Sequence, residues 1–260
     1  MEQVRSSMGL VEGKIAMVTG AASGMGREGA RVFAREGAAH VYVLDVNVSG
    51  GNETVEIAKQ AGAGATFIAL DVTDEDAVAA TVARIVEEQG RLDCAWNNAG
   101  INDVSKAFHE FTKAEWDRMI AVNLSSVYWC MKHEITQMLQ QGSGAICNTS
   151  SGAGLIAAPG LPHYTAAKHG VLGLVKAAAE ELNNSGIRVN AVCPGMVDTP
   201  MIRGWFATNP DLAQAVLQTM PGKRLLDPIE VAEAAVWLCS DTARGVSGLS
   251  MTVDAGGLNR

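Results

Sequence analysis

The sequence has few cysteines, and their arrangement excludes a disulfide-stapled scaffold. There are five, an odd number, and no two of them form a Cys-x-x-Cys pair. They stand at Cys94, Cys130, Cys147, Cys193 and Cys239. Three of them, Cys94, Cys147 and Cys193, lie in short apolar runs, so we expect buried side chains that act as small hydrophobic groups. This usage is typical of a reducing cytoplasm.

Long hydrophobic runs and clusters of positive charge are also missing. No stretch reaches the roughly 18 consecutive apolar residues of a membrane span. Residues 1–8 lack the apolar region of a secretory signal. The chain carries 20 Lys and Arg against 28 Asp and Glu, a net charge of −8, and no basic run of five or more. These absences predict a cytoplasmic protein that neither spans a membrane nor binds nucleic acid.

Short apolar runs instead alternate with longer segments of helical periodicity along nearly all of the 260 residues. This alternation, without strict polar spacing in the short runs, indicates a parallel sheet covered on both faces by helices. We therefore predict one α/β domain over residues 1–260 with about seven strands. The expected strands are Lys14–Thr19, His40–Asp45, Ala65–Leu70, Leu92–Trp96, Ala145–Ser150, Ile187–Cys193 and Ser250–Val253. The expected helices are Met25–Glu36, Ser49–Ala61, Asp74–Gln89, Thr112–Gln141, His163–Ser185 and Pro228–Ser240.

One long connection, residues 198–220, falls outside this alternation. It carries apolar bulk, including Met201, Trp205 and Phe206. We expect it to be a lid over the active site, and an ordinary pair of additional helices is the alternative.

A glycine-rich turn, from Thr19 to Gly26, follows the first predicted strand and begins the first predicted helix. Glycines let the backbone approach a pyrophosphate, and the free N–H groups of a helix N-terminus stabilise its charge. The second predicted strand ends at Asp45, where a carboxylate can accept hydrogen bonds from an adenosine ribose. A carboxylate there would also repel the 2′-phosphate of NADP, and no cation stands at positions 21–23 or 46–47. The pattern predicts NAD as the cofactor.

Asp71 ends the third predicted strand. Its position allows contact with the adenine edge of the cofactor, but a turn role within Asp71-Val72-Thr73-Asp74 is almost equally consistent with the sequence.

Tyr164 and Lys168 stand one helical turn apart, so their side chains share a face. A tyrosine with a pKa of about 10 is a poor base near neutrality, but a nearby ammonium group and a cationic nicotinamide favour the phenolate. In isolation such a pair is usually a surface contact. The neighbouring motifs favour a functional role.

Five motifs occur in one order: Thr19–Gly26, Asn97-Asn98-Ala99-Gly100, Ser151, Tyr164-x-x-x-Lys168 and Pro194-Gly195-x-Val197-x-Thr199. In order and spacing they resemble the short-chain dehydrogenase/reductase family over nearly the whole chain. Two departures are small: Met25 replaces the usual Ile or Leu, and Val253-Asp254-Ala255-Gly256-Gly257 replaces Val-Asp-Gly-Gly. The resemblance implies a Rossmann-type, doubly wound sheet of seven strands and a homotetramer or dimer built on the helices Thr112–Gln141 and His163–Ser185.

The resemblance also implies the site residues. Tyr164 is the implied general base, and Lys168 lowers its pKa and binds the nicotinamide ribose. Ser151 orients the substrate oxygen; its thirteen-residue distance from Tyr164 selects it over Ser150. Asn123, otherwise interpreted as a buried hydrogen-bonding residue, is implied to hold a water of the proton relay. The expected cofactor-binding residues are Gly20, Ser23, Met25, Gly26, Asp45, Asp71, Val72, Asn98, Tyr164, Lys168, Val197 and Thr199.

Together these features predict an NAD-dependent dehydrogenase that converts a secondary alcohol to a ketone. The substrate pocket is expected between the lid and the loops 102–104 and 152–161, where mostly apolar side chains predict a neutral, hydrophobic or alicyclic substrate. These side chains are Leu155, Ile156, Leu161, Met196, Met201, Trp205 and Phe206. No metal is expected, because His163, His169 and Cys130-x-x-His133 lack further ligands.

Two alternatives remain open. One is a 3-ketoacyl-thioester reductase, which usually uses NADPH and is therefore disfavoured by Asp45. The other is a regulatory protein that binds a dinucleotide without turnover, which the filled positions Asn123, Ser151, Tyr164 and Lys168 argue against.

Overall fold

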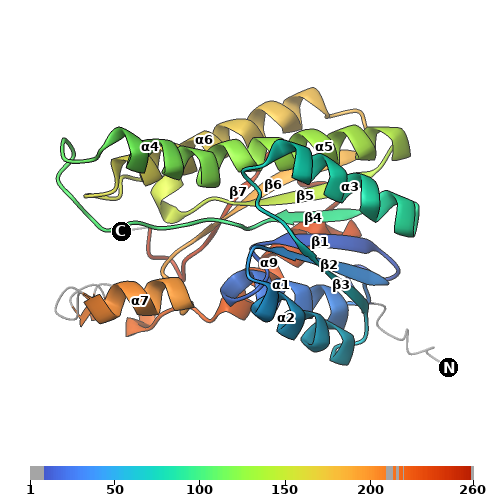
Figure 1. Ribbon diagram of the computed structural model, residues 1–260, viewed down its shortest axis with the longest axis horizontal. Helices are drawn as coiled ribbons and strands as arrows, with labels where there is room; N and C mark the ends of the chain where they lie inside the picture. Colours follow the sequence, from blue (N-terminus) through green and yellow to red (C-terminus); the bar gives the residue numbers. More distant parts are fainter. Residues whose placement is uncertain (1–8, 209–212, 215–216, 219, 259–260) are drawn as a thin grey trace.

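The computed structural model describes residues 9–208, 213–214, 217–218 and 220–258. Seven parallel strands form one sheet in the order β3-β2-β1-β4-β5-β6-β7 (Figure 1). The carboxyl ends of all strands therefore meet at one edge. The strand order reverses between β1 and β4, the point where open α/β sheets bind ligands. The strands are β1 (Ile15–Thr19), β2 (His40–Asp45), β3 (Gly64–Ala69), β4 (Cys94–Asn97), β5 (Gly144–Thr149), β6 (Ile187–Pro194) and β7 (Ser250–Val253).

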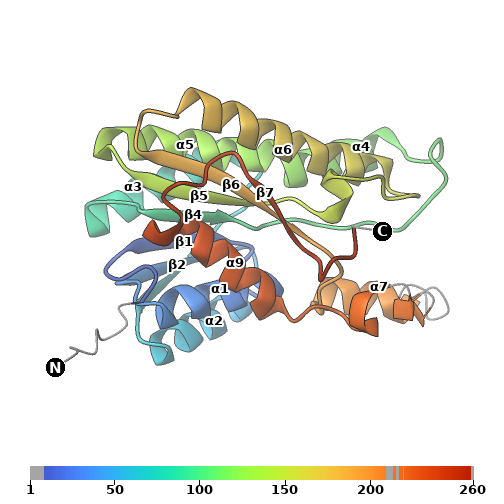
Figure 2. The same cartoon turned by 180° about the vertical axis from the view of Figure 1, so that it is seen from behind.

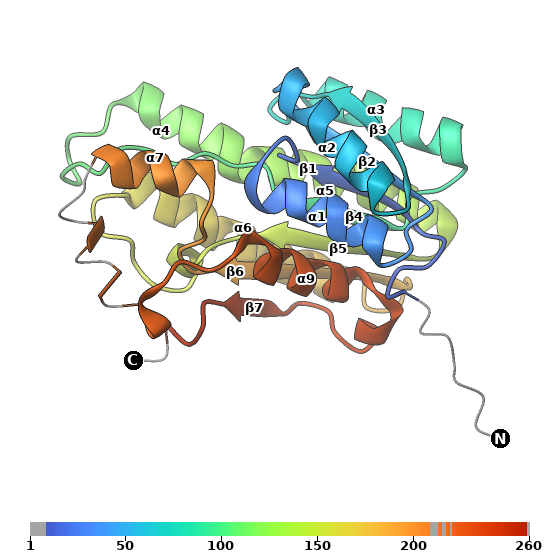
Figure 3. The same ribbon diagram turned by 90° about the horizontal axis from the view of Figure 1, so that it is seen from below.

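Helices cover both faces of the sheet, which confirms the predicted fold class. One face carries α1 (Gly24–Arg35), α2 (Val48–Gln60) and α9 (Pro228–Cys239) (Figures 1 and 2). The other carries α3 (Glu75–Gln89), α5 (Ser126–Gln141) and α6 (Pro162–Glu181). Two further helices, α4 (Lys113–Ile120) and α7 (Pro200–Thr208), lie toward the carboxyl edge (Figure 3). Within the described part of the chain, no helix is long and apolar enough to cross a membrane.

Local capping signals explain where several helices begin. Thr112 and Glu115 form a reciprocal capping box at the start of α4, and Asp227 and Glu230 form another at α9. The side chain of Asp74 accepts the Ala77 N–H at the start of α3. Because each cap satisfies amide groups that the helix leaves free, the boundaries follow from short-range sequence.

The helix predicted over Thr112–Gln141 is wrong in one respect. Its two α-helical parts, α4 and α5, are joined by a π-helical turn over Ala121–Ser125. Such a turn inserts one residue into the helical repeat and is frequent at functional sites. Here it contains Asn123, which is fully buried.

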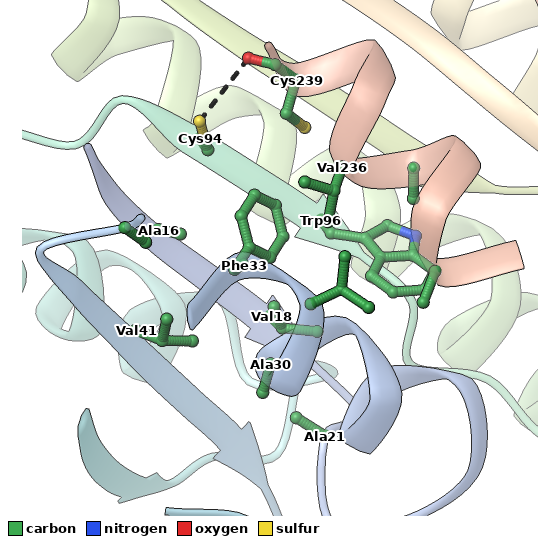
Figure 4. Close-up of a cluster of buried hydrophobic side chains, with 14 of the residues drawn as sticks. Ala16, Val18, Ala21, Ala30, Phe33, Val41, Cys94, Trp96, Val236 and Cys239 are labelled. Atoms are coloured by element: carbon green, nitrogen blue, oxygen red, sulfur yellow. Dashed lines mark hydrogen bonds between the residues drawn. The ribbon is translucent and has the colours of Figure 1, made fainter. Parts of the chain in front are cut away.

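The core beside the site is centred on Trp96 of β4 (Figure 4). Its ring packs against α1, where a Cβ atom at Gly29 would lie 2.1 Å from it. The indole N–H donates to Thr149 Oγ1 at 2.9 Å. On the same side, the Cys94 thiol donates to the Cys239 carbonyl at 3.6 Å. All five cysteines are buried and free, which confirms their prediction as small core side chains.

Candidate active site

The glycine turn lies between β1 and α1 and packs tightly against the end of β4. Gly20 has a φ of +65°, and a Cβ atom there would lie 2.8 Å from Ala99 Cα. A Cβ atom at Gly26 would lie 2.3 Å from the Gly20 carbonyl oxygen. Ser23 precedes α1 without capping it through its side chain. The first N–H groups of α1 therefore have no side-chain acceptor from this cap position, and the cradle fits a pyrophosphate group.

Asn98 holds this turn in place. Its side-chain amide donates to the carbonyls of Thr19 at 3.2 Å and Gly20 at 3.4 Å. The Thr19 hydroxyl accepts the backbone N–H groups of Asn98 and Ala99, both at 3.0 Å. Sequence reasoning did not find the part played by Thr19, because a threonine at a strand end has no distinctive signal. The two residues fix the turn to the strand end beside it.

Asp45 lies at the end of β2 and also faces the turn. One carboxylate oxygen accepts the Ala22 N–H and the other accepts the Asn47 N–H, each at 2.9 Å. Each oxygen keeps a second lone-pair direction for another donor. The carboxylate is therefore fixed beside the glycine turn with acceptor capacity to spare.

Arg27 is a cation near this position that the sequence analysis missed. Its guanidinium donates to the Ala22 carbonyl at 2.6 Å and pairs with Glu53 at 3.0 Å. It also contacts the Gly50 carbonyl at 3.3 Å and Thr54 Oγ1 at 3.1 Å. Its charge is thus already engaged between the turn and α2.

Asp71 and Val72 follow β3. The Asp71 carboxylate accepts both the Thr73 N–H at 2.9 Å and the Thr73 hydroxyl at 2.7 Å, within a local turn. Val72 is buried in the core beneath it. The turn role is therefore present, and only one oxygen of Asp71 makes these contacts, so the other is open to a ligand.

Two serines at the end of β5 have different surroundings. The Ser150 hydroxyl is buried and donates to the Lys168 carbonyl at 2.9 Å. Ser151 begins the short turn Gly152–Gly154, where its hydroxyl accepts the Ala153 N–H at 3.1 Å. A hydrogen-bonding contribution from Ser151 lowers the pKa of the Tyr164 phenol. Of the two serines, Ser151 is the one beside the tyrosine.

Tyr164 and Lys168 lie on the first turns of α6, as the spacing predicted. The Lys168 ammonium is 5.7 Å from the centre of the Tyr164 ring and donates to the Thr149 carbonyl at 2.9 Å. Burial lowers the pKa of Lys168 to about 8. Burial also raises the pKa of Tyr164, and the hydrogen bond from Ser151 opposes that increase. The net pKa of the phenol is therefore raised in this structure, and the lowering of that pKa by Lys168 stays a prediction.

Asn123 in the π-helical turn holds the chain after β4. Its side chain accepts the Ile101 N–H and donates to the Ile101 carbonyl, both at 3.1 Å. A Cβ atom at Gly100 would lie 2.7 Å from Asn123 Oδ1 and 3.7 Å from Lys168 Nζ. Because Gly100 has no side chain, Asn123 and Lys168 can both approach its backbone.

A cavity of about 100 Å³ brings most of these residues together. The predicted residues that line it come from six segments of the chain. Thr199 also contacts the glycine turn, because a Cβ atom at Gly24 would lie 3.1 Å from its methyl group. Asp45, Asp71 and Val72 do not line this cavity; they lie at the ends of β2 and β3. The predicted lining residues are Met25, Asn98, Asn123, Ser151, Tyr164, Lys168, Val197 and Thr199.

A second cavity, of about 370 Å³, adjoins the first and shares Ser151 and Tyr164 with it. Its lining is mostly apolar, and none of its lining residues among those described is charged. Five of the seven predicted residues line it. Leu155 does not, because it is exposed, and Phe206 does not, because it packs on the Trp205 ring with centroids 5.4 Å apart. The five are Ile156, Leu161, Met196, Met201 and Trp205. Sequence reasoning placed Ile202 in the predicted lid without assigning it to the pocket, and it missed Leu258.

The predicted lid begins with α7, which contributes Met201, Ile202 and Trp205 to this cavity. Residues 209–212, 215–216 and 219 of the predicted lid lie outside the described residues. Just before α7, Val197 forms a parallel bridge with Leu226, and the Asp198 N–H donates to the Leu226 carbonyl at 2.8 Å. Arg203 is paired with Asp198 through two contacts of 2.6 and 2.8 Å. Its charge is neutralised outside the cavity.

Histidines near the site take part in packing. His163 is fully buried, contacts the Phe111 ring at 4.1 Å and faces Asp103 at 3.4 Å. No group of three or more His, Cys, Asp or Glu side chains in the described ranges has an arrangement suited to a metal ion.

Comparison with known proteins adds independent information. A family model described as enoyl-(acyl carrier protein) reductase matches residues 20–258. A cis-4-hydroxycyclohexanecarboxylate dehydrogenase of Sinomonas cyclohexanicum is 43% identical, over 94% of this chain and 96% of the relative. An A-factor type gamma-butyrolactone 1′-reductase of Streptomyces virginiae is 41% identical, over 95% of this chain and 96% of the relative. The structure of carveol dehydrogenase from Mycobacterium avium in complex with NAD superposes with a TM-score of 0.91 at 34% identity, covering 97% of this chain and all of that one.

Proposed function

Because the chain belongs to the short-chain dehydrogenase/reductase family and is an oxidoreductase of alcohols and ketones, we propose that it oxidises a neutral, cyclic secondary alcohol with NAD. The observation that carries the proposal is the position of Ser151 and Tyr164. Both line the small cavity that also contains Lys168 and Asn123, and both line the larger, uncharged cavity beside it. A substrate in the larger cavity would present its hydroxyl group to these two side chains.

The cofactor site is assigned to the residues around the glycine turn. Gly20, Ser23 and Gly26 would hold the pyrophosphate, and Asp45 the adenosine ribose. Met25, Asn98, Val197 and Thr199 would border the nicotinamide end, and Asp71 and Val72 the adenine. When bound, NAD accepts the hydride and brings a positively charged ring next to the reacting carbon. The preference for NAD over NADP rests on Asp45 and on the prior engagement of Arg27 with Glu53.

Proton removal is assigned to Tyr164. Its phenolate oxygen would take the hydroxyl proton of the substrate, while the Ser151 hydroxyl orients the same oxygen. Since burial raises the pKa of this phenol in the free chain, the positive charge that arrives with the cofactor is needed to favour the phenolate. Lys168 would hydrogen-bond the nicotinamide ribose, and Asn123 would fix the backbone that carries the water of the proton relay.

The substrate class is proposed from the larger cavity. Its apolar lining favours a compact hydrophobic ring, and the relative from Sinomonas cyclohexanicum acts by name on a substituted cyclohexane. The carboxylate in that relative's substrate has no counterpart cation in the described lining of this cavity. Arg203 is the cation beside the cavity on α7, and it is paired with Asp198. We therefore propose a neutral alicyclic alcohol or ketone.

A 3-ketoacyl-thioester reductase is the second candidate, because the matching family model is described as an enoyl-(acyl carrier protein) reductase, whose substrate is also an acyl thioester. The two candidates differ in cofactor. The reductase would use NADPH, whose 2′-phosphate the Asp45 carboxylate would repel, whereas the alcohol dehydrogenase would use NAD. A further alternative, a protein that binds a dinucleotide without turnover, would show neither activity.

We also propose a cytoplasmic homotetramer built on α4–α5 and α6. Support comes from an apolar groove of about 450 Å³ on their outer surface, lined by Leu124, Tyr128, Trp129 and Leu174 among others. Light scattering on the purified protein tests the assembly, and a monomer at micromolar concentration would contradict it.

The test of function is spectrophotometric. NADH formation from NAD and NADPH formation from NADP are followed with a panel of alicyclic, aliphatic, dihydrodiol and steroid alcohols, with Tyr164→Phe as the control. We expect turnover of alicyclic alcohols with NAD, and a loss of at least about 100-fold in the variant. A preference for NADP would favour the thioester reductase instead. Full activity in Tyr164→Phe would refute the assigned base.

A further inference from the structure

A glutamate with no role in the proposed chemistry is buried inside the molecule. Glu134 lies near the middle of α5 and is fully buried. One of its carboxylate oxygens, Oε2, accepts the side-chain amide of Asn97 on β4 at 3.0 Å. Glu134 forms no salt bridge with any of the described residues. Burial raises the pKa of this carboxyl to about 8.

The pair contains two further polar atoms that lack partners. Glu134 Oε1 and Asn97 Oδ1 are both buried, and neither has a hydrogen-bond partner among the described residues. Both are acceptors when the carboxyl is ionised, and a buried acceptor without a donor costs about 1–3 kcal/mol. The two unpaired atoms belong to the two residues that already share one hydrogen bond. A single proton on Oε1 would give both atoms a partner.

We propose that Glu134 is a neutral carboxylic acid, which donates its proton to Asn97 Oδ1 while accepting the Asn97 amide, and that this acid–amide pair positions the end of β4. Two antiparallel hydrogen bonds then close a ring between the two planar groups. Ionisation would leave two buried acceptors facing each other.

The pair is connected to the cofactor turn through β4. Asn97 also donates to Asn148 Oδ1 on β5 at 3.1 Å, and Asn148 donates to the Asn190 carbonyl on β6 at 3.4 Å. The residue after Asn97 is Asn98, which holds the glycine turn. Glu134 is therefore a positioning residue, because it acts on the cofactor site only through Asn97 and Asn98.

No charged group around Glu134 pairs with its carboxylate among the described residues, so the proton is assigned to Glu134 itself. Cys130, one turn earlier on α5, is the titratable group that interacts with it, and its own pKa is raised by burial. The neighbours Lys132 and His133 contact Glu75 on α3 instead. Asn97, which donates to Glu134, and Asn148, which accepts from Asn97, are uncharged.

The sign of the pH effect follows from the proton balance. An unfolded glutamate releases its proton near its ordinary pKa of 4.5, whereas the folded chain holds it up to about pH 8. Stability is therefore highest at low pH on this account and falls as the pH rises from 4.5 to about 8. The neutral isostere Glu134→Gln donates and accepts in the same directions and cannot ionise.

The first experiment compares melting temperatures of ligand-free wild type, Glu134→Gln and Glu134→Leu between pH 6 and pH 9. Glu134→Gln is expected to exceed wild type already at pH 6, because the unfolded glutamate is ionised there, and the difference should grow until about pH 8. Glu134→Leu leaves Asn97 Oδ1 unpaired and is expected to be less stable than Glu134→Gln at both pH values, with a KM for NAD about tenfold higher and kcat little changed. Equal pH dependence in wild type and Glu134→Gln would overturn the proposal, as would equal melting temperatures of the two variants at pH 6.

A second measurement needs no variant. Carboxyl NMR of wild type labelled at the glutamate side chains is expected to show one glutamate still protonated at pH 6.5, and a spectrum in which every glutamate is ionised would refute the assignment. The KM readout rests on the proposed function. The melting and NMR readouts do not, so their failure is distinguishable from failure of the proposed activity.

Discussion

Asp45→Asn is predicted to reverse or abolish the preference for NAD over NADP. The structure places the Asp45 carboxylate at the end of β2, fixed by the N–H groups of Ala22 and Asn47 at 2.9 Å each. Asparagine keeps nearly the same shape and removes only the charge and one acceptor. The change therefore isolates the electrostatic part of cofactor selection.

The magnitude has two parts. A hydrogen bond to a charged group contributes about 1.5–3 kcal/mol and a neutral one about 1, so the variant loses about 0.5–2 kcal/mol toward NAD. Repulsion between two unit charges about 5 Å apart is about 3 kcal/mol at an effective dielectric constant of 20, and solvent around the partly exposed Asp45 reduces it to about 1–2 kcal/mol. The ratio of kcat/KM for NAD to that for NADP should therefore fall by roughly 10- to 700-fold.

The assay is the initial rate with each cofactor at a fixed concentration of the best alcohol. Asp71→Asn is the matched control, since it removes the same charge at the end of the neighbouring strand and should leave the NAD/NADP ratio unchanged. The Asp45 variant should also melt a few degrees lower, because its amide group faces a backbone N–H. An unchanged cofactor ratio in Asp45→Asn, with the protein folded, would refute the reasoning.

Four further substitutions test the site. Ser151→Ala should lower kcat about 100-fold without lowering the melting temperature, whereas Ser150→Ala should lose about 1–3 kcal/mol of stability and keep turnover; the reverse pattern would contradict the assignment. The folded pKa of Lys168, about 8, lies below its ordinary 10.5, so its burial costs up to about 3 kcal/mol below pH 8 and nothing above 10.5. Lys168→Met should therefore gain stability over wild type at pH 7 in urea titrations, lose that advantage by pH 10.5, and be inactive. Gly26→Ala places a methyl group 2.3 Å from the Gly20 carbonyl and should abolish cofactor binding in calorimetry.

The sheet could be predicted because its signals are local. His40–Asp45 and Ser250–Val253 match β2 and β7 residue for residue, and the start of α9 follows from a cap and a proline beside each other. The position of the glycine turn between β1 and α1 could be predicted for the same reason, because it depends on backbone geometry over a few residues. Parallel strands that are covered on both faces consist of nearly continuous apolar residues, so they can be recognised from the sequence alone.

The rest depends on partners that are distant in the sequence. The π-helical turn keeps an almost helical periodicity, so the sequence predicted one uninterrupted helix there. The contacts of Arg27 with Glu53 and of Glu134 with Asn97 join residues 26 and 37 positions apart. Their existence depends on how helices pack on the sheet, which short-range patterns do not encode.

The bridge between Val197 and Leu226 has a consequence for how such a protein can change over evolution. The chain leaves the sheet edge at Val197 and returns to it at Leu226, so the connection that begins with α7 is anchored at both ends. Because the entropy of closing a loop grows only slowly with its length, a change in the length of such an anchored connection costs the sheet little stability. Substitutions on α7 can therefore change the lining of the larger cavity while Tyr164, Lys168 and the glycine turn stay in place.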